Sequence, residues 1–152
     1  MAASGGTSGV IYSITNNINS KEPSRINHFA HVNYNDDSKS IGKLLCINGA
    51  GIQYRWLRNH SVGKSYEKMN EAASSIPVGS EGISVIPFGN GAERMLNNKN
   101  IGTHICNINL NQHSHGHLYR SSLEGIAFSF MYGMEILKND NALKRIESGE
   151  KE

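Results

Sequence analysis

The sequence predicts an α/β fold in which a mixed sheet is packed by helices. Residues 3–15 are typical of a β-hairpin, because a turn of glycines and hydroxyl residues separates two strand-like segments. Apolar and polar residues alternate over 28–34, as in a strand with one buried face. Apolar and small residues then recur every three or four positions from about Ser114 or His117 to about Lys138, which predicts a long amphipathic helix.

The composition indicates one domain, or a piece of one. The chain has 152 residues, 38% of them hydrophobic, and a formal net charge of +2. Its lysines and arginines form no basic stripe, which argues against a nucleic-acid partner. No apolar run approaches the roughly 18 to 20 residues of a membrane-spanning helix, and the first residues lack the basic and apolar regions of a signal peptide. We therefore expect no membrane partner and a cytoplasmic location.

After the hairpin the sequence predicts a loop, further strands and a helix. Residues 16–27 are polar and are expected to form a loop, and 35–37 form a turn after the next strand. From 41 to 59 the apolar residues fall near helical spacing but are interrupted at 48–51. This pattern predicts a strand, a turn and a short helix in which Trp56 lies in the core.

A second helix is predicted over 65–75, with Ser65 as its N-cap. Residues 79–82 are expected to form a turn, and 83–87 a short buried strand closed by its proline. The charged residues 139–152 are expected to form a frayed or artificial tail. The core stripe of the long helix has helical spacing and is widened by two more side chains; it consists of Leu118, Ser122, Ile126, Phe130, Gly133 and Leu137, with Phe128 and Met131.

The cysteines and histidines are candidates for a metal or redox site. Cys46 and Cys106 lie in apolar segments and are expected to be buried, reduced thiols. Five potential zinc ligands fall within fourteen residues, namely His104, Cys106, His113, His115 and His117. The gap between Cys106 and His113 matches no standard zinc spacing, so we predict no metal site.

Two glycine-rich turns are candidates for a ligand site. In the turn from Gly5 to Gly9, glycines allow a phosphate to approach the backbone, and Thr7, Ser8 and backbone N–H groups can donate to it. The same residues also suit an ordinary hairpin turn. The turn at 48–51 feeds a helix whose free N–H groups can hold an anion or a nucleotide, the alternative being a tight turn without a ligand.

The acidic residues provide no candidate for a general base. Glu93 and Arg94 are adjacent in the glycine-rich loop 87–95 and are expected to form a solvated or ion-paired loop anchor. No motif places a carboxylate of this chain against a substrate hydroxyl; the acids considered are Asp36, Asp37, Glu93 and Glu124.

Four segments, taken in order, carry a resemblance to one known family. Gly6-Thr7-Ser8-Gly9-Val10 is similar to the phosphate motif that begins the family's C-terminal domain. Asn48-Gly49-Ala50-Gly51, with Gln53 and Trp56-Leu57-Arg58, is similar to its nucleotide-contacting segment. The stretch from Pro87 to Arg94 resembles its proline-aromatic loop, with Ala92 in place of a glycine, and the stretch from His117 to Phe128 resembles its second signature. The family is the FGGY carbohydrate kinases, and the xylulokinase-like members in particular.

This resemblance implies an actin-like ATPase (ribonuclease H-like) fold, with residues 1–138 as an incomplete C-terminal kinase domain and 139–152 as a charged tail. It implies ATP and magnesium as cofactors and a pentulose sugar as substrate, most simply D-xylulose converted to D-xylulose 5-phosphate. Another pentulose, glycerol or gluconate remains open as the substrate, as does a non-catalytic actin-like binding module. The chain departs from the family pattern at Asn109-Leu110, where a glycine normally precedes an aliphatic residue.

The resemblance also assigns roles to individual residues. It implies that Gly6, Thr7, Ser8 and Gly9 contact phosphate, and that Gly49 and Gln53 contact the nucleotide. It leaves His113, His115 and His117 with structural roles at a loop and a helix start. No catalytic residue is assigned, because the family's base lies upstream of the segment that Met1 begins. We therefore expect a fragment that is inactive alone, lacks its N-terminal domain as a partner, and can pair as a homodimer through exposed apolar surface.

Overall fold

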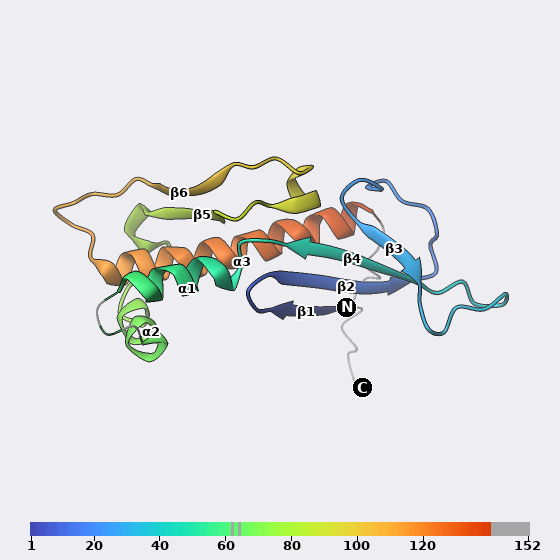
Figure 1. Cartoon of the computed structure of the whole chain (residues 1–152), viewed down its shortest axis with the longest axis horizontal. Helices are drawn as coiled ribbons and strands as arrows, with labels where there is room; N and C mark the ends of the chain where they lie inside the picture. The colour runs from blue at the N-terminus through green and yellow to red at the C-terminus, as the bar shows by residue number, and fades with distance from the viewer. Residues whose placement is uncertain (62, 64, 141–152) are drawn as a thin grey trace, which may run out of the picture.

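The computed structural model describes residues 1–61, 63 and 65–140 (Figure 1). Within these residues two sheets and three α-helices form. The larger sheet has the strand order β1-β2-β4-β3, with β1 at Ala2–Gly5, β2 at Gly9–Thr15, β4 at Ile41–Ile47 and β3 at Asn27–Ala30. The smaller sheet pairs β5, Ser84–Phe88, with β6, Gly102–Cys106.

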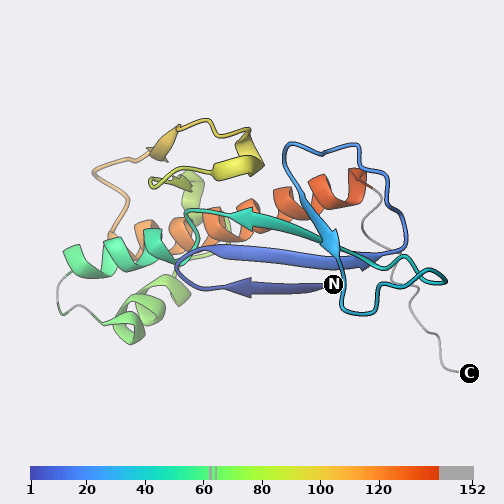
Figure 2. The same ribbon diagram turned by 45° about the vertical axis from the view of Figure 1, so that its right-hand side comes forward.

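The helices lie between and beside these sheets. They are α1 at Gly51–His60, α2 at Tyr66–Ser74 and α3 at His115–Asn139, and two short 3-10 turns, η1 and η2, cover Ser80–Gly82 and Glu93–Leu96. Helix α3 runs along the molecule, with the β5–β6 pair on one side and the larger sheet on another (Figures 1 and 2). None of the helices in the described part of the chain is long and apolar enough to cross a membrane.

The main core forms where α3 covers one face of the larger sheet. Ile11 of β2 lies opposite Leu45 of β4, and both side chains are fully buried. Gly133 of α3 lies over them, and a Cβ there would be 3.1 Å from the methyl groups of Ile11, Leu45 and Ile47. The missing side chain therefore lets the helix pack closely on the sheet. A second core cluster joins α1, α2 and α3 through Tyr54, Leu57, Met69, Ala73 and Tyr119.

Most of the predicted elements are confirmed, with local differences. The hairpin and the strand, turn and helix of 41–59 form, and Ser65 caps α2 by accepting a hydrogen bond from the Lys68 N–H. Strand β3 ends at Ala30, earlier than predicted, and β5 runs through Pro87 to Phe88. Strand β6 had no counterpart in the prediction. Every strand pair among the described residues is antiparallel, whereas the sequence predicted a mixed sheet.

Several predicted core positions are wrong. Trp56 is 54% exposed, and Phe128 and Met131 are 61% and 52% exposed. The buried side of α3 is narrower than the predicted stripe. Phe128 and Met131 lie outside it, on the part of the helix surface that does not pack on the sheets. Cys46 and Cys106 are only half-buried.

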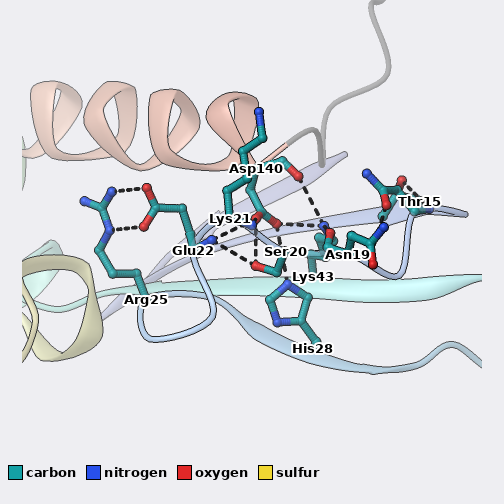
Figure 3. Close-up of polar contacts among 10 residues, drawn as sticks. Thr15, Asn19, Ser20, Lys21, Glu22, Arg25, His28, Lys43 and Asp140 are labelled. Atoms are coloured by element: carbon teal, nitrogen blue, oxygen red, sulfur yellow. Dashed lines mark hydrogen bonds and ion pairs between the residues drawn. The ribbon is translucent and has the colours of Figure 1, made fainter.

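The end of α3 is tied to the rest of the fold by a buried ion pair (Figure 3). Lys43 Nζ lies 2.7 Å from Asp140 Oδ2, and neither side chain is exposed. The other carboxylate oxygen accepts hydrogen bonds from Ser20 Oγ and from the N–H groups of Lys21 and Glu22, at 2.7, 2.6 and 3.1 Å. Two residues of the predicted tail belong to the fold, because α3 includes Asn139 and Asp140 is buried. Residues 141–152 of that predicted tail lie outside the described residues.

These contacts control the ionisation of Asp140. Burial by itself raises the pKa of the carboxyl, but the hydrogen bonds from Lys43, Ser20 and the two backbone N–H groups outweigh it and lower the pKa to about 2. The unfolded value is about 3.9. Because the folded pKa is the lower one, the stabilisation is present above the unfolded pKa and is lost as the pH falls from about 4 towards 2.

Replacing this carboxylate is expected to destabilise the fold strongly. Asp140→Asn leaves Lys43 buried without its counter-charge, which costs about 3 kcal/mol or more. The free energy of unfolding, measured by urea denaturation at pH 7, should fall by that amount, and the loss should shrink as the pH falls below about 4. Asp36→Asn, on an exposed turn, serves as the control and should change little. An equal stability of the Asp140 variant and the wild type at pH 7 would contradict the role given to the pair.

Candidate functional site

Three segments that are distant in sequence meet at the start of α1. They are the turn between β1 and β2, the turn at 48–51, and the end of β5 with its following loop. A cavity of about 360 Å³ opens beside them. Helix α1 contributes Ile52, Gln53 and Trp56 to its walls, and the β5–β6 side contributes Pro87, Gly89, Asn90 and Thr103. The predicted nucleotide residue Gln53 thus lines a pocket.

The β1–β2 turn is bonded to the first turn of α1. The N–H groups of Gly51 and Ile52 donate to the carbonyl oxygens of Gly6 and Thr7, at 2.9 and 3.0 Å. The helix needs these partners, because Ala50 at its N-cap has no side chain that could accept a hydrogen bond. This corrects the prediction of free N–H groups at the helix start. It also brings the two predicted ligand segments into direct contact.

Side chains extend this junction towards the loop after β5. Ser8 Oγ donates to Asn48 Oδ1 at 2.8 Å, and Asn48 Nδ2 donates to Glu93 Oε1 at 3.0 Å. Glu93 therefore anchors its loop through Asn48, and the described ion pairs include none between Glu93 and Arg94.

Glu93 also affects the nearby Cys46 thiol. Burial raises the pKa of this thiol most, and the negative charge of Glu93 raises it further. The raised pKa favours the unreactive protonated form.

Two of the predicted site residues have a clear packing role. Gly49 has φ +87°, and a Cβ there would overlap the carbonyl oxygen of Pro87. Only glycine combines this backbone conformation with this close approach. A Cβ on Gly9 would overlap the ring of Phe130, so α3 packs directly on this end of the hairpin.

The side chain of Gln53 is held at the pocket wall. It is 6% exposed, and its Oε1 accepts a hydrogen bond from Thr103 Oγ1 at 2.9 Å. This bond fixes the orientation of the Gln53 amide. Thr103 was missed by the sequence analysis. Trp56 was placed in the nucleotide-contacting segment by resemblance, but it was expected in the core and was not named as a site residue. Trp56 could have been found, because it follows Gln53 by three positions and therefore lies on the same side of α1.

Three of the candidate histidines, His113, His115 and His117, lie at or just before the start of α3 and do not line the pocket. His117 Nδ1 accepts a hydrogen bond from the Ser114 N–H at 3.0 Å, so its Nε2 carries the proton and donates to Glu81 Oε2 at 3.1 Å. His113 Nδ1 accepts from the Asn109 N–H at 2.9 Å. These bonds give His117 and His113 the structural role that the sequence predicted. Among residues 1–61, 63 and 65–140, no group of three or more His, Cys, Asp or Glu side chains is arranged to hold a metal ion.

Glu124, another acid considered as a base, accepts three hydrogen bonds from neighbouring groups. Its carboxylate accepts hydrogen bonds from the Gly79 N–H, Ser80 Oγ and Arg120 Nε, at 3.0, 2.9 and 2.8 Å. Partial burial raises the pKa of the carboxyl, but these bonds, led by that from Arg120, bring the pKa below its usual value. They hold the turn of 79–82, in which Ser80 and Glu81 both have positive φ, against α3.

Comparison with known proteins places the chain among sugar kinases. The model of the FGGY family of carbohydrate kinases, C-terminal domain, matches residues 1–148. A xylulose kinase of Haemophilus influenzae is 26% identical over 133 residues, which are 88% of this chain and 26% of that protein. The chain thus spans about a quarter of the length of this relative.

Solved structures show the same fold. The xylulose kinase from Rhodospirillum rubrum matches with a TM-score of 0.78 at 19% identity, over 92% of this chain and 27% of that one. The glycerol kinase of Plasmodium falciparum, solved with ADP, matches with a TM-score of 0.76 at 17% identity, over 93% of this chain and 28% of that one. Both similarities support the actin-like ATPase fold.

The geometry at Gly49 leads to a stability prediction. Gly49→Ala adds a Cβ that overlaps Pro87, so it should cost several kcal/mol, combining overpacking with an unfavourable φ. Gly91→Ala is the matched control, because Gly91 has φ +89° and open space around its Cβ position. The control should lose only about 1 to 2 kcal/mol. Urea unfolding measures the loss of unfolding free energy in both variants. Equal losses would show that the close contact between Gly49 and Pro87 does not limit the stability of the alanine variant.

Proposed function

The chain belongs to the FGGY family of carbohydrate kinases, and from this premise we propose that it is the C-terminal part of an ATP-dependent sugar kinase acting on D-xylulose. The reaction is the transfer of the ATP γ-phosphoryl group to a sugar hydroxyl, giving D-xylulose 5-phosphate and ADP. The xylulose kinase relative supports this choice of sugar. Glycerol, gluconate or another pentulose is the alternative, since a glycerol kinase shares the fold.

The observation that carries the proposal is the bonding of the β1–β2 turn to the start of α1. It places the segment of Gly6, Thr7, Ser8 and Gly9 beside the segment of Gly49 and Gln53. In our proposal the turn contacts the phosphates and the pocket lined by Gln53 receives the nucleoside. The main-chain hydrogen bonds support the proposal, because they hold the two segments together and a nucleotide site requires preorganised groups.

Phosphoryl transfer needs positioned phosphates, a metal ion and a base for the acceptor hydroxyl. We propose that magnesium enters on the phosphates of ATP and that the base comes from outside residues 1–152. Glu93 and Glu124 are both committed to hydrogen bonds that hold loops in place, and Asp36 and Asp37 lie on an exposed turn. In this proposal the sugar and the N-terminal domain are the further partners of this chain. The cytoplasm is its compartment, and two copies pair as a homodimer.

Nucleotide binding tests this proposal. Gln53→Ala should weaken binding of Mg·ATP by about tenfold, because it removes one hydrogen-bonding side chain from the pocket wall. Isothermal titration calorimetry measures the dissociation constant. Gln112→Ala is the matched control, because Gln112 is an exposed glutamine that bonds to Glu81 instead. Mg·ATP binding that is insensitive to Gln53 would place the nucleotide elsewhere.

A turnover assay tests the proposal that the catalytic base lies outside residues 1–152. The isolated chain, with Mg·ATP and D-xylulose, glycerol or D-gluconate, should release no sugar-dependent ADP. Clear turnover by this chain alone would refute the statement that the base lies outside it. With the N-terminal domain present, the sugar that raises ADP release identifies the substrate.

A further inference from the structure

An exposed tryptophan stands at the edge of the pocket, backed by a histidine. Trp56 is the chain's single tryptophan and is 54% exposed, although it belongs to the residue type that gains most from burial. His60 follows it by one helical turn, and the two rings lie 4.3 Å apart between centroids with an interplanar angle of 31°. The indole is therefore supported on one side by a second ring and borders the pocket.

A hydrogen bond holds the supporting ring in place. His60 Nδ1 lies 2.8 Å from the carbonyl oxygen of Trp56. A carbonyl oxygen only accepts, so Nδ1 carries the hydrogen and donates it. The imidazole is thereby fixed both to the backbone of Trp56 and against its ring. Since an unsupported surface tryptophan would lose rotamer freedom on binding a ligand, this support reduces the cost of binding.

The position of Trp56 indicates which part of a ligand it would meet. The phosphate turn bonds to Gly51 and Ile52 at the start of α1, and Trp56 lies five residues after Gly51. At 1.5 Å per residue this is about 7.5 Å down the helix axis. The neighbouring pocket side chains include the apolar Ile52 and Pro87. An apolar wall beyond the phosphate end suits a flat aromatic base, which stacks on aromatic rings.

We propose that His60 is a positioning residue that holds Trp56 as a stacking platform for the base of the nucleotide. This inference rests on the proposed function, because it assigns the base end of the same ligand. It divides the affinity for ATP into two contributions: the β1–β2 turn binds the phosphates, and Trp56, held by His60, stacks on the base.

The free protein gives the first test, because all tryptophan fluorescence comes from Trp56. In His60→Ala the emission maximum should shift to the red and acrylamide quenching should increase, because the indole loses its supporting ring. His31→Ala, a histidine on the turn after β3, is the control and should behave as the wild type. His60→Phe keeps a ring and should restore most of the protection. Unchanged quenching in His60→Ala would show that the rings are not stacked in solution and would overturn the proposal.

Ligand binding gives the second test, with Mg·ATP and inorganic tripolyphosphate as the probes. Trp56→Ala should weaken ATP binding by roughly fivefold to a hundredfold, the loss of one base-stacking contact. His60→Ala should weaken it by about threefold to tenfold, with recovery in His60→Phe. Neither variant should alter the affinity for tripolyphosphate, which has no base. Circular dichroism should show that both variants fold, since both side chains lie at the surface.

The outcomes separate the two proposals. If the wild type binds ATP and the variants lose affinity for ATP and tripolyphosphate equally, or not at all, the stacking platform is wrong and the nucleotide site stands. If the wild type binds tripolyphosphate but gains no affinity from the adenosine group of ATP, the stacking platform is again wrong. If it binds neither probe, both the nucleotide site and the platform fail.

Discussion

The close packing of α3 against both sheets is the constraint on which the rest of the structure depends. Gly133 lets the helix lie on the larger sheet, and Gly125 lets it lie on β5, where a Cβ would overlap the Val85 carbonyl oxygen. The same helix contacts α1 and α2. At its end the buried Asp140 binds Lys43 of β4 and the loop at 20–22. Because α1 and β5 are both packed on α3, the pocket between them has walls of fixed separation.

Main-chain groups, more than side chains, build the candidate site. The carbonyl oxygens of the β1–β2 turn satisfy the N–H groups at the start of α1, so the helix terminus that could bind an anion is used to hold the turn. In this arrangement any phosphate contact falls to the turn itself. Gly49 allows a second close backbone contact, with the Pro87 carbonyl at the end of β5. The junction depends on glycines at particular backbone positions, so we expect substitutions there to destabilise the fold.

The sequence predicts what local patterns can determine. The glycine-rich turn predicted the hairpin, the interrupted helical spacing predicted β4 with α1, and the capping residue Ser65 predicted the start of α2. The burial of particular side chains depends on neighbours that lie far away in sequence. Trp56 has the spacing of a core residue, yet its side chain is 54% exposed at the edge of the pocket. The pairing of Gly6 with Gly51, and of Thr103 with Gln53, also joins distant segments and has no local signal.

Four carboxylates of the described residues, those of Glu81, Glu93, Glu124 and Asp140, are used to hold the fold together. A general base needs an oxygen that is free to accept the proton of a substrate hydroxyl, and a pKa near the working pH. The pKa values of Asp140 and Glu124 are lowered by the hydrogen bonds that they accept. Glu93 holds Asn48, and Glu81 accepts from His117. Carboxylates used in this way hold loops in place, and our proposal that the base lies outside this chain requires none of them to be released for proton transfer.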